Sequence, residues 1–130
     1  MKKLLTMLVL FTVMLVFAGI DLCYTEAFYK STHEDLTKAA VSIELNADCL
    51  DNAETVSLVV MANAGWEKGK KRLMMLVNHN LVRYVDEKFV SLIEQVRGNN
   101  KDDAGVTVKV LLSFIKDLKE ENHLLLTNIL

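Results

Sequence analysis

Residues 71–97 constrain the fold most, because apolar side chains recur through them at steps of three or four positions without a break. This spacing places the side chains on one face of an α-helix. The residues on that face are Met74, Val77, Leu81, Val85, Phe89, Leu92 and Val96. Further apolar residues widen the face at its edges, namely Leu73, Leu76, Val82 and Ile93. We therefore predict one continuous helix, about 40 Å long, that contacts helices on more than one side.

The composition favours a small all-α protein with a single core. The chain has 130 residues, enough for one domain, and it contains no proline and only five glycines. Because proline breaks helix interiors and marks loops, its absence is typical of a few long helices joined by short connections. We predict a small helical bundle of about four helices.

The N-terminus has the three parts of a secretory signal peptide. Lys2 and Lys3 provide the positive start, residues 4–17 form the apolar run, and Ala18 ends a small-residue cleavage motif. We predict cleavage after Ala18, with residues 1–18 as the signal peptide. An uncleaved membrane anchor is the competing interpretation, but the length of this run, which two threonines interrupt, is marginal for spanning a bilayer.

Cleavage would leave residues 19–130 as a single helical domain with an acidic balance. Loss of Lys2 and Lys3 moves the formal net charge from −2 to −4. Such a surface lacks the clustered lysine and arginine that nucleic-acid binding requires, and it offers little attraction to anionic lipid. We therefore expect a secreted, extracellular protein with no nucleic-acid partner and no stable insertion into a membrane after cleavage.

Cys23 and Cys49 are the only two cysteines, and export favours a disulfide between them. A straight helix over residues 23–49 would hold its ends roughly 39 Å apart, far beyond the reach of a disulfide. An intramolecular bond therefore requires a break in the helix. Free thiols or a bond between two chains are the alternatives.

A capping box supplies a candidate for that break. Ser31 with Glu34, or Thr32 with Asp35, has the spacing of a helix N-terminus. We predict a helix over residues 32–47. Residues 24–29 would then run back along it and bring the two cysteines together.

A second helix is predicted after the capping pair Asp51 and Glu54. It contains residues 56–61, an apolar run rich in β-branched side chains that could equally be a buried strand. We choose a helix because alanines flank the run and no partner strand is evident. Gly98-Asn99-Asn100 is the clearest loop signal, since glycine often follows a helix end and asparagine tolerates left-handed conformations.

The last helix should begin after that loop, capped by Asp102 or Asp103. Residues 106–110 alternate like a strand, but helical spacing takes over after them. The expected core face is Leu111, Phe114, Ile115, Leu118 and Leu125.

Signatures of catalysis, metal binding or cofactor binding are missing from the sequence. His33, His79 and His123 lie far apart and outside any His-Glu-x-x-His or Cys-x-x-Cys motif. The serines fall within helical patterns rather than in a Gly-x-Ser-x-Gly turn. Adjacent acid pairs are explained by helix capping and solubility. We therefore expect a non-enzymatic protein that uses no metal and no cofactor.

A basic cluster beside the single tryptophan is the candidate interaction surface. Its residues are Trp66, Lys68, Lys70, Lys71 and Arg72. Aromatic and arginine side chains often anchor protein interfaces. Our leading hypothesis is that the secreted bundle binds another macromolecule, most simply a protein, through its helix surfaces.

Methionines offer a first alternative. Met61, Met74 and Met75 could line a gap between helices that admits a lipid or another small apolar ligand, because methionine adapts its shape. With such a gap the protein would be an extracellular carrier. Methionines of this kind more often fill a core.

A second alternative rests on Gly69-Lys70-Lys71-Arg72, which resembles the processing and amidation signal of peptide-hormone precursors. A convertase would cut after Arg72, and the glycine would become an amide on Lys68. A charged helix turn is the simpler interpretation, because a short motif of this kind often matches by chance.

Overall fold

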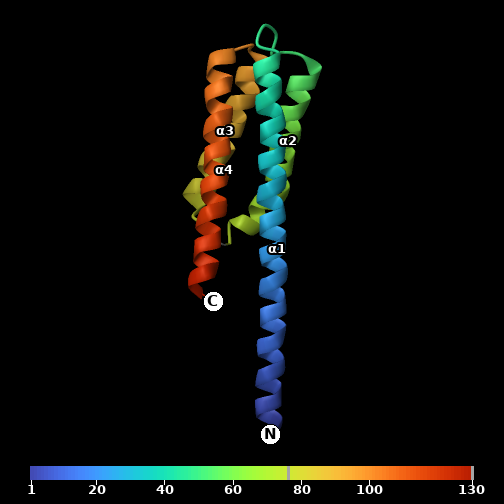
Figure 1. Ribbon diagram of the computed structural model, residues 1–130, viewed down its shortest axis with the longest axis vertical. Coiled ribbons are helices and arrows are strands. Elements are labelled where there is room, and N and C mark those ends of the chain that lie inside the picture. The colour runs from blue at the N-terminus through green and yellow to red at the C-terminus, as the bar shows by residue number, and fades with distance from the viewer. Residues whose placement is uncertain (76, 130) are drawn as a thin grey trace.

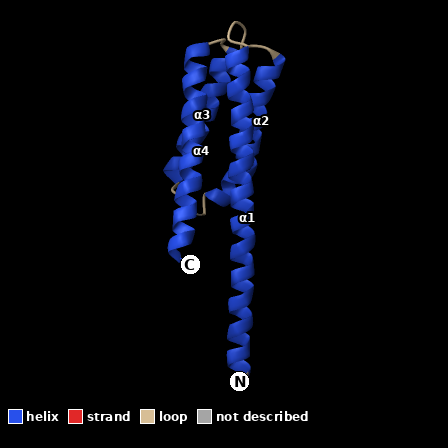
Figure 2. Cartoon of the chain, in the orientation of Figure 1, coloured by secondary structure: helices blue, strands red, loops and turns tan. Residues whose placement is uncertain are grey.

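The computed structural model describes residues 1–75 and 77–129, and in this part of the chain helices are the only regular secondary structure (Figure 2). The side chains at positions 125, 126 and 129 lie outside the description. The helices are α1 (Lys2–Leu45), α2 (Ala53–Leu73), α3 (His79–Arg97) and α4 (Lys101–Ile129). The prediction of an all-α bundle of about four helices is confirmed.

The four helices form a closed ring in which each packs on its neighbours in chain order. α1 contacts α2, α2 contacts α3, α3 contacts α4, and α4 returns to contact α1. The loops between them are short, so successive helices run antiparallel. Figure 1 shows the first and third connections at one end of the bundle, and the α2–α3 turn with the C-terminus at the other.

The first half of α1 projects beyond the bundle as a single exposed helix (Figure 1). Every residue from Met1 to Asp21 is exposed, and packing begins at Leu22. This helix is long and apolar enough to cross a membrane, and a signal sequence has the same properties. The projecting segment is therefore compatible with the predicted signal sequence, whose expected boundary at Ala18 falls outside the packed region.

The predicted break near Ser31 is wrong, because α1 runs without interruption from Lys2 to Leu45. Thr32, expected at a helix start, is buried inside it. The reason is a continuous core face on both sides of the proposed cap. Its residues are Thr25, Phe28, Tyr29, Thr32, Leu36, Ala39 and Ile43. Burial of this face outweighs the local capping preference of Ser31 and Thr32.

The predicted continuous helix over residues 71–97 is also wrong. α2 ends at Leu73, and α3 begins at His79, where the Asn78 side chain accepts a hydrogen bond of 2.9 Å from the Asn80 N–H. The apolar periodicity continues across the turn because the end of α2 and the start of α3 each carry core residues. Breaking the helix lets α2 and α3 pack antiparallel, which buries both faces.

Most of the predicted face nevertheless lies in the core. Val82, Val85, Phe89, Leu92 and Val96 are buried on α3, as is Leu73 on α2. Val77, Leu81 and Ile93 pack partly against the core, Met74 is exposed in the turn, and Leu76 lies outside the described residues. On α4, Leu111, Ile115 and Leu118 are buried and Phe114 is half-buried; the Leu125 side chain lies outside the description.

The loop predicted at Gly98-Asn99-Asn100 is confirmed. Asn99, rather than the glycine, takes the left-handed conformation with a φ of 55°. The Asn100 N–H donates to the Gln95 carbonyl oxygen at 2.8 Å, which closes the end of α3. Asn99 Oδ1 also accepts a hydrogen bond of 2.8 Å from the Leu50 N–H, so this turn anchors the α1–α2 loop.

Asparagine, rather than the predicted aspartate, caps the N-termini of α2 and α4. Asn52 Oδ1 accepts from the Thr55 N–H at 2.8 Å, which places the α2 cap one residue after Asp51. Asn100 Oδ1 accepts from the Asp103 N–H at 3.3 Å at the start of α4. The predicted starts were therefore close, and the identity of each capping residue was wrong.

α1 packs closely on α2 where Phe28 lies over Gly69. A Cβ at Gly69 would overlap Cε2 and Cδ2 of the Phe28 ring. Gly69 therefore has a packing role inside α2, although glycine lowers helix propensity. The ring of Phe28 also contacts Trp66, with centroids 5.7 Å apart.

Replacing Gly69 with alanine should destabilise the bundle by about 1–3 kcal/mol, because the new methyl group overpacks the contact with Phe28. Gly65→Ala is the matched control in the same helix, since its Cβ would meet only Asp35 Oδ2 at an ordinary 3.5 Å. That control should gain up to about 1 kcal/mol from helix propensity. Chemical denaturation of both variants measures the difference, and equal stabilisation by the two alanines would contradict this packing.

Candidate ligand-binding cleft

Trp66, the expected anchor of an interaction surface, lies in the core instead. It is 0% exposed, and its ring stacks on Phe89 with centroids 6.2 Å apart. Its Nε1–H donates a hydrogen bond of 2.6 Å to Asp86 Oδ1 on α3. The prediction that Trp66 is a surface residue is wrong, because Ala62, Trp66 and Gly69 continue the core face of α2.

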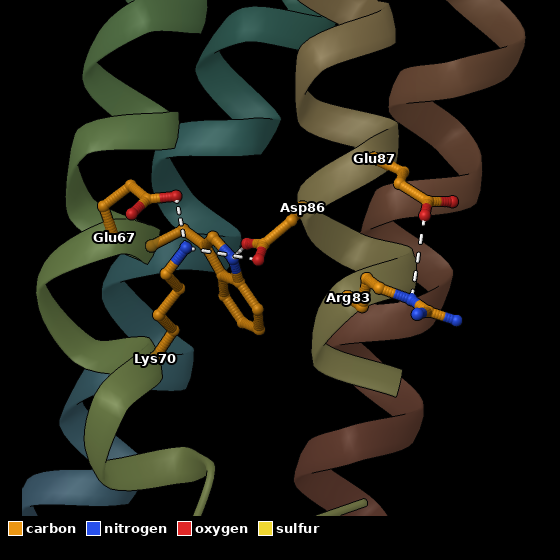
Figure 3. Close-up of polar contacts among 6 residues, drawn as sticks. Glu67, Lys70, Arg83, Asp86 and Glu87 are labelled. Atoms are coloured by element: carbon orange, nitrogen blue, oxygen red, sulfur yellow. Dashed lines mark hydrogen bonds and ion pairs between the residues drawn. The ribbon is translucent and has the colours of Figure 1, made fainter. Parts of the chain in front are cut away.

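Lys70 likewise forms its polar contacts within the bundle. Its Nζ donates to Glu67 Oε1 at 2.7 Å and to Asp86 Oδ2 at 3.2 Å, as Figure 3 shows. The hydrogen bond to Glu67, followed by the interactions with Asp86, raises the pKa of Lys70 although its burial opposes this. Lys70 and Trp66 therefore share one carboxylate and link α2 to α3.

The rest of the basic cluster is exposed. Lys68 and Lys71 face solvent, and Arg72 lies over the Tyr24 ring with its guanidinium carbon 4.2 Å from the ring centroid. Arg72 also approaches Asp21 at 3.7 Å. Three of the five predicted interaction residues therefore remain available at the end of α2.

Removing the shared carboxylate should destabilise the bundle. Asp86→Ala leaves the buried Trp66 Nε1–H without its partner, which costs about 1–3 kcal/mol. Glu87→Ala is the control, because Glu87 makes only an exposed contact of 3.8 Å with Arg83 (Figure 3) and such pairs contribute little. Thermal unfolding compares the two, and equal midpoints would contradict a structural role for the Trp66–Asp86 bond.

The methionines do not line a cavity. Met61 is on the outer surface of α2, and Met74 and Met75 lie in the α2–α3 turn, where Met75 is 87% exposed. The predicted Met-lined gap is therefore corrected. The turn that ends α2 moves Met74 and Met75 out of the helical face to which the sequence pattern assigned them.

The predicted bond between Cys23 and Cys49 is not formed. Both cysteines are free and exposed. α1 continues unbroken from Cys23 to Leu45, a separation of roughly 33 Å along the axis. The geometric condition for an intramolecular disulfide is therefore not met, and the prediction is wrong for this fold.

A cleft of about 750 Å³ opens between α1 and α4. Its lining residues come from one stretch of each helix, residues 22–29 and 116–127. They are Leu22, Glu26 and Tyr29 on α1, with Lys116, Lys119, Glu120, Asn122, His123 and Thr127 on α4. The wall is mainly apolar. Long side chains such as those of lysine contribute carbon surface along their stems.

Unequal helix lengths account for the position of this cleft. The rings of Tyr84 and Phe114 pack together with centroids 4.7 Å apart. Antiparallel pairing from that contact places His79, where α3 begins, about level with Lys119. α4 continues to Ile129, and α1 extends in the same direction past Leu22. The two longer helices therefore face each other at the end of the bundle where α2 and α3 stop (Figure 1).

Tyr29 is the most unusual residue of the cleft wall. The residue is 1% exposed, and no described atom forms a hydrogen bond with its hydroxyl. Burial raises the pKa of Tyr29 to about 12, and the negative charge of Glu121 contributes in the same direction. The hydroxyl therefore stays protonated at neutral pH and can donate or accept a hydrogen bond.

No sequence pattern predicted this cleft. Residues 24–29 were expected outside the helical core, as a segment running back along the chain. The signal that could have corrected this is the helical spacing of Thr25, Phe28, Thr32 and Leu36, which continues across the proposed break. No pattern within either helix could show that α1 and α4 would extend beyond the ends of α2 and α3.

The histidines do not come together. His33 and His79 are exposed on α1 and α3, and His123 lines the cleft on α4. Among the described residues, no group of three or more histidine, cysteine, aspartate or glutamate side chains is arranged to hold a metal ion.

Comparison of the chain with protein-family models, with curated proteins and with solved structures finds no match.

Proposed function

We propose that the protein is exported and that it acts as a non-enzymatic carrier of a small apolar or amphiphilic ligand, held between α1 and α4. The observation that supports this is the cleft of about 750 Å³ with its mainly apolar wall. Ligand sites in proteins are typically clefts of roughly 300–1,000 Å³, lined by apolar groups with a few polar ones. Tyr29, His123 and Asn122 are the polar groups that would orient a ligand here.

Binding of a macromolecule is the second candidate, and a different surface favours it. Lys68, Lys71 and Arg72 remain exposed at the end of α2, next to Met75, which is almost fully accessible. An apolar side chain with basic neighbours suits an acidic protein surface. This candidate stands second because Trp66, which would have been its strongest anchor, is buried.

Export is supported by the way in which the N-terminal helix is attached. Residues 1–18 form an apolar helix with a positive start, and they contribute no buried residue to the bundle. Their removal would leave the core and the cleft intact. We propose that the mature carrier begins at Gly19.

The intact chain is the form that we propose to act, rather than peptides released at Arg72. Gly69 packs against Phe28 inside α2, and Arg72 lies in the last turn of that helix. A cut there would divide one hydrophobic core into two parts. Neither part alone could bury its apolar face.

Export and processing predict a single mass. Protein collected from the medium of a secreting host should have the mass of residues 19–130. Reductant should lower the observed mass only if a disulfide joins two chains. Mass spectrometry with and without reductant provides the measurement. Fragments ending near Lys68 would support the hormone-precursor alternative, and retention of residues 1–18 in a membrane fraction would support an anchor.

The carrier function predicts a fluorescent response with N-phenyl-1-naphthylamine, which should bind the exported protein in the cleft. Asn122→Phe fills the cleft and should weaken probe binding roughly tenfold or more. Ser113→Phe is the matched control on an exposed part of the same helix, away from the cleft lining. It should bind the probe as the unmodified protein does.

Circular dichroism of both variants establishes that they fold alike. Lipid extraction and mass spectrometry of the native secreted material should also recover a co-purified apolar compound. Equal probe binding by the two phenylalanine variants, together with an empty extract, would reject the carrier function.

A further inference from the structure

The Tyr29 hydroxyl is a buried, unpaired polar group on a residue that lines the cleft. A buried hydroxyl without a hydrogen-bond partner is unfavourable for folding, and most buried polar groups in proteins avoid this state. Two other buried hydroxyls, those of Ser42 and Thr55, form a hydrogen bond of 2.8 Å with each other. Tyr29 differs from these because it lines the cleft.

A second unpaired polar atom provides a contrast. Gln95 Oε1 also has no partner among the described residues. Gln95 lies on α3 beside the Gly98-Asn99-Asn100 turn, at the opposite end of the bundle, and it is not among the cleft residues. Of these two unpaired atoms among the described residues, only the Tyr29 hydroxyl is on a residue that lines a cleft of ligand size.

The charges around the cleft restrict what can approach the hydroxyl. Lys116 and Lys119 are balanced by Glu26 and Glu120, so the described lining residues carry no net charge apart from His123. Glu121 adds a negative charge whose field already disfavours the ionised phenol. The same field would disfavour a carboxylate or phosphate placed against the hydroxyl.

We infer that Tyr29 is the specificity-determining residue of the cleft and that its ligand is an uncharged amphiphile, a long-chain ketone, aldehyde, ester or alcohol, whose oxygen accepts a hydrogen bond from the Tyr29 hydroxyl. This rests on the proposed carrier function. The apolar chain of the ligand would lie along the carbon surface of Leu22 and the lysine stems. A neutral oxygen completes the hydrogen bonding of Tyr29 and introduces no charge near Glu121.

The test uses three probes of equal chain length, 2-decanone, decane and decanoate, which compete with N-phenyl-1-naphthylamine for the exported protein at pH 7. One hydrogen bond corresponds to about a five- to tenfold difference in affinity. The unmodified protein should therefore bind 2-decanone about five- to tenfold more tightly than decane, and also more tightly than decanoate. Tyr29→Phe should abolish the preference for the ketone and leave the affinity for decane unchanged.

Two control variants separate recognition from folding. Tyr84→Phe removes a tyrosine hydroxyl on α3, outside the cleft, and should preserve the preference for 2-decanone. Glu121→Gln removes the opposing charge and should raise the affinity for decanoate towards that for the ketone. In the free protein Tyr29→Phe should melt at the same temperature or higher, because the hydroxyl has no described partner to lose; a lower midpoint would count against the inference.

The possible failures are distinguishable. If all three probes bind equally well to the unmodified protein and to Tyr29→Phe, the carrier function stands and the role of Tyr29 is rejected. A preference for decanoate over 2-decanone in the unmodified protein would reject an uncharged ligand. If no probe competes, the carrier function fails and this inference fails with it.

Discussion

Contact between three aromatic rings holds this bundle together. Phe28 of α1 lies against Trp66 of α2 with ring centroids 5.7 Å apart, and Trp66 stacks on Phe89 of α3 at 6.2 Å. Phe28 can take this position because Gly69 beneath its ring has no side chain. The second contact places the indole N–H where Asp86 can accept its hydrogen bond. Burial of the largest side chain in the protein therefore depends on residues from three helices at once.

The cleft follows from the same ring of helices through a difference in length. α2 and α3 end at a short turn near the aromatic contacts, whereas α1 and α4 continue beyond it (Figure 1). Where four helices surround the core, side chains fill the space between them. Where only two helices remain, they cannot enclose a core, and the space between them stays open to a ligand. The functional proposal thus concerns the part of the molecule that the bundle does not close.

Polar groups in the interior have two kinds of role. Asp86 satisfies Trp66 and Lys70, and Ser42 satisfies Thr55, so these groups stabilise the contacts between helices. The Tyr29 hydroxyl is equally buried, yet it stabilises nothing among the described residues. It belongs to a residue that lines the cleft, which is the basis for the proposed role of Tyr29 in ligand binding.

Local sequence patterns were sufficient to predict the helical class, the approximate number of helices, the loop at Gly98-Asn99-Asn100 and most of the core face of α3. These features follow from local spacing and from turn preferences, which act within a few residues. The same local rules misplaced two helix boundaries. A capping box at Ser31 suggested a break that was absent, and a periodic pattern continued across the turn before His79.

Which helix faces are buried depends on packing between helices that are distant in the sequence. Trp66 became a core residue because α3 supplied Asp86 and Phe89, and the two cysteines were kept apart because a core face on α1 outweighed its caps. The position of the cleft depends on the relative lengths of the four helices. Burial depends on partners distant in the sequence, so no pattern within one segment contains that information.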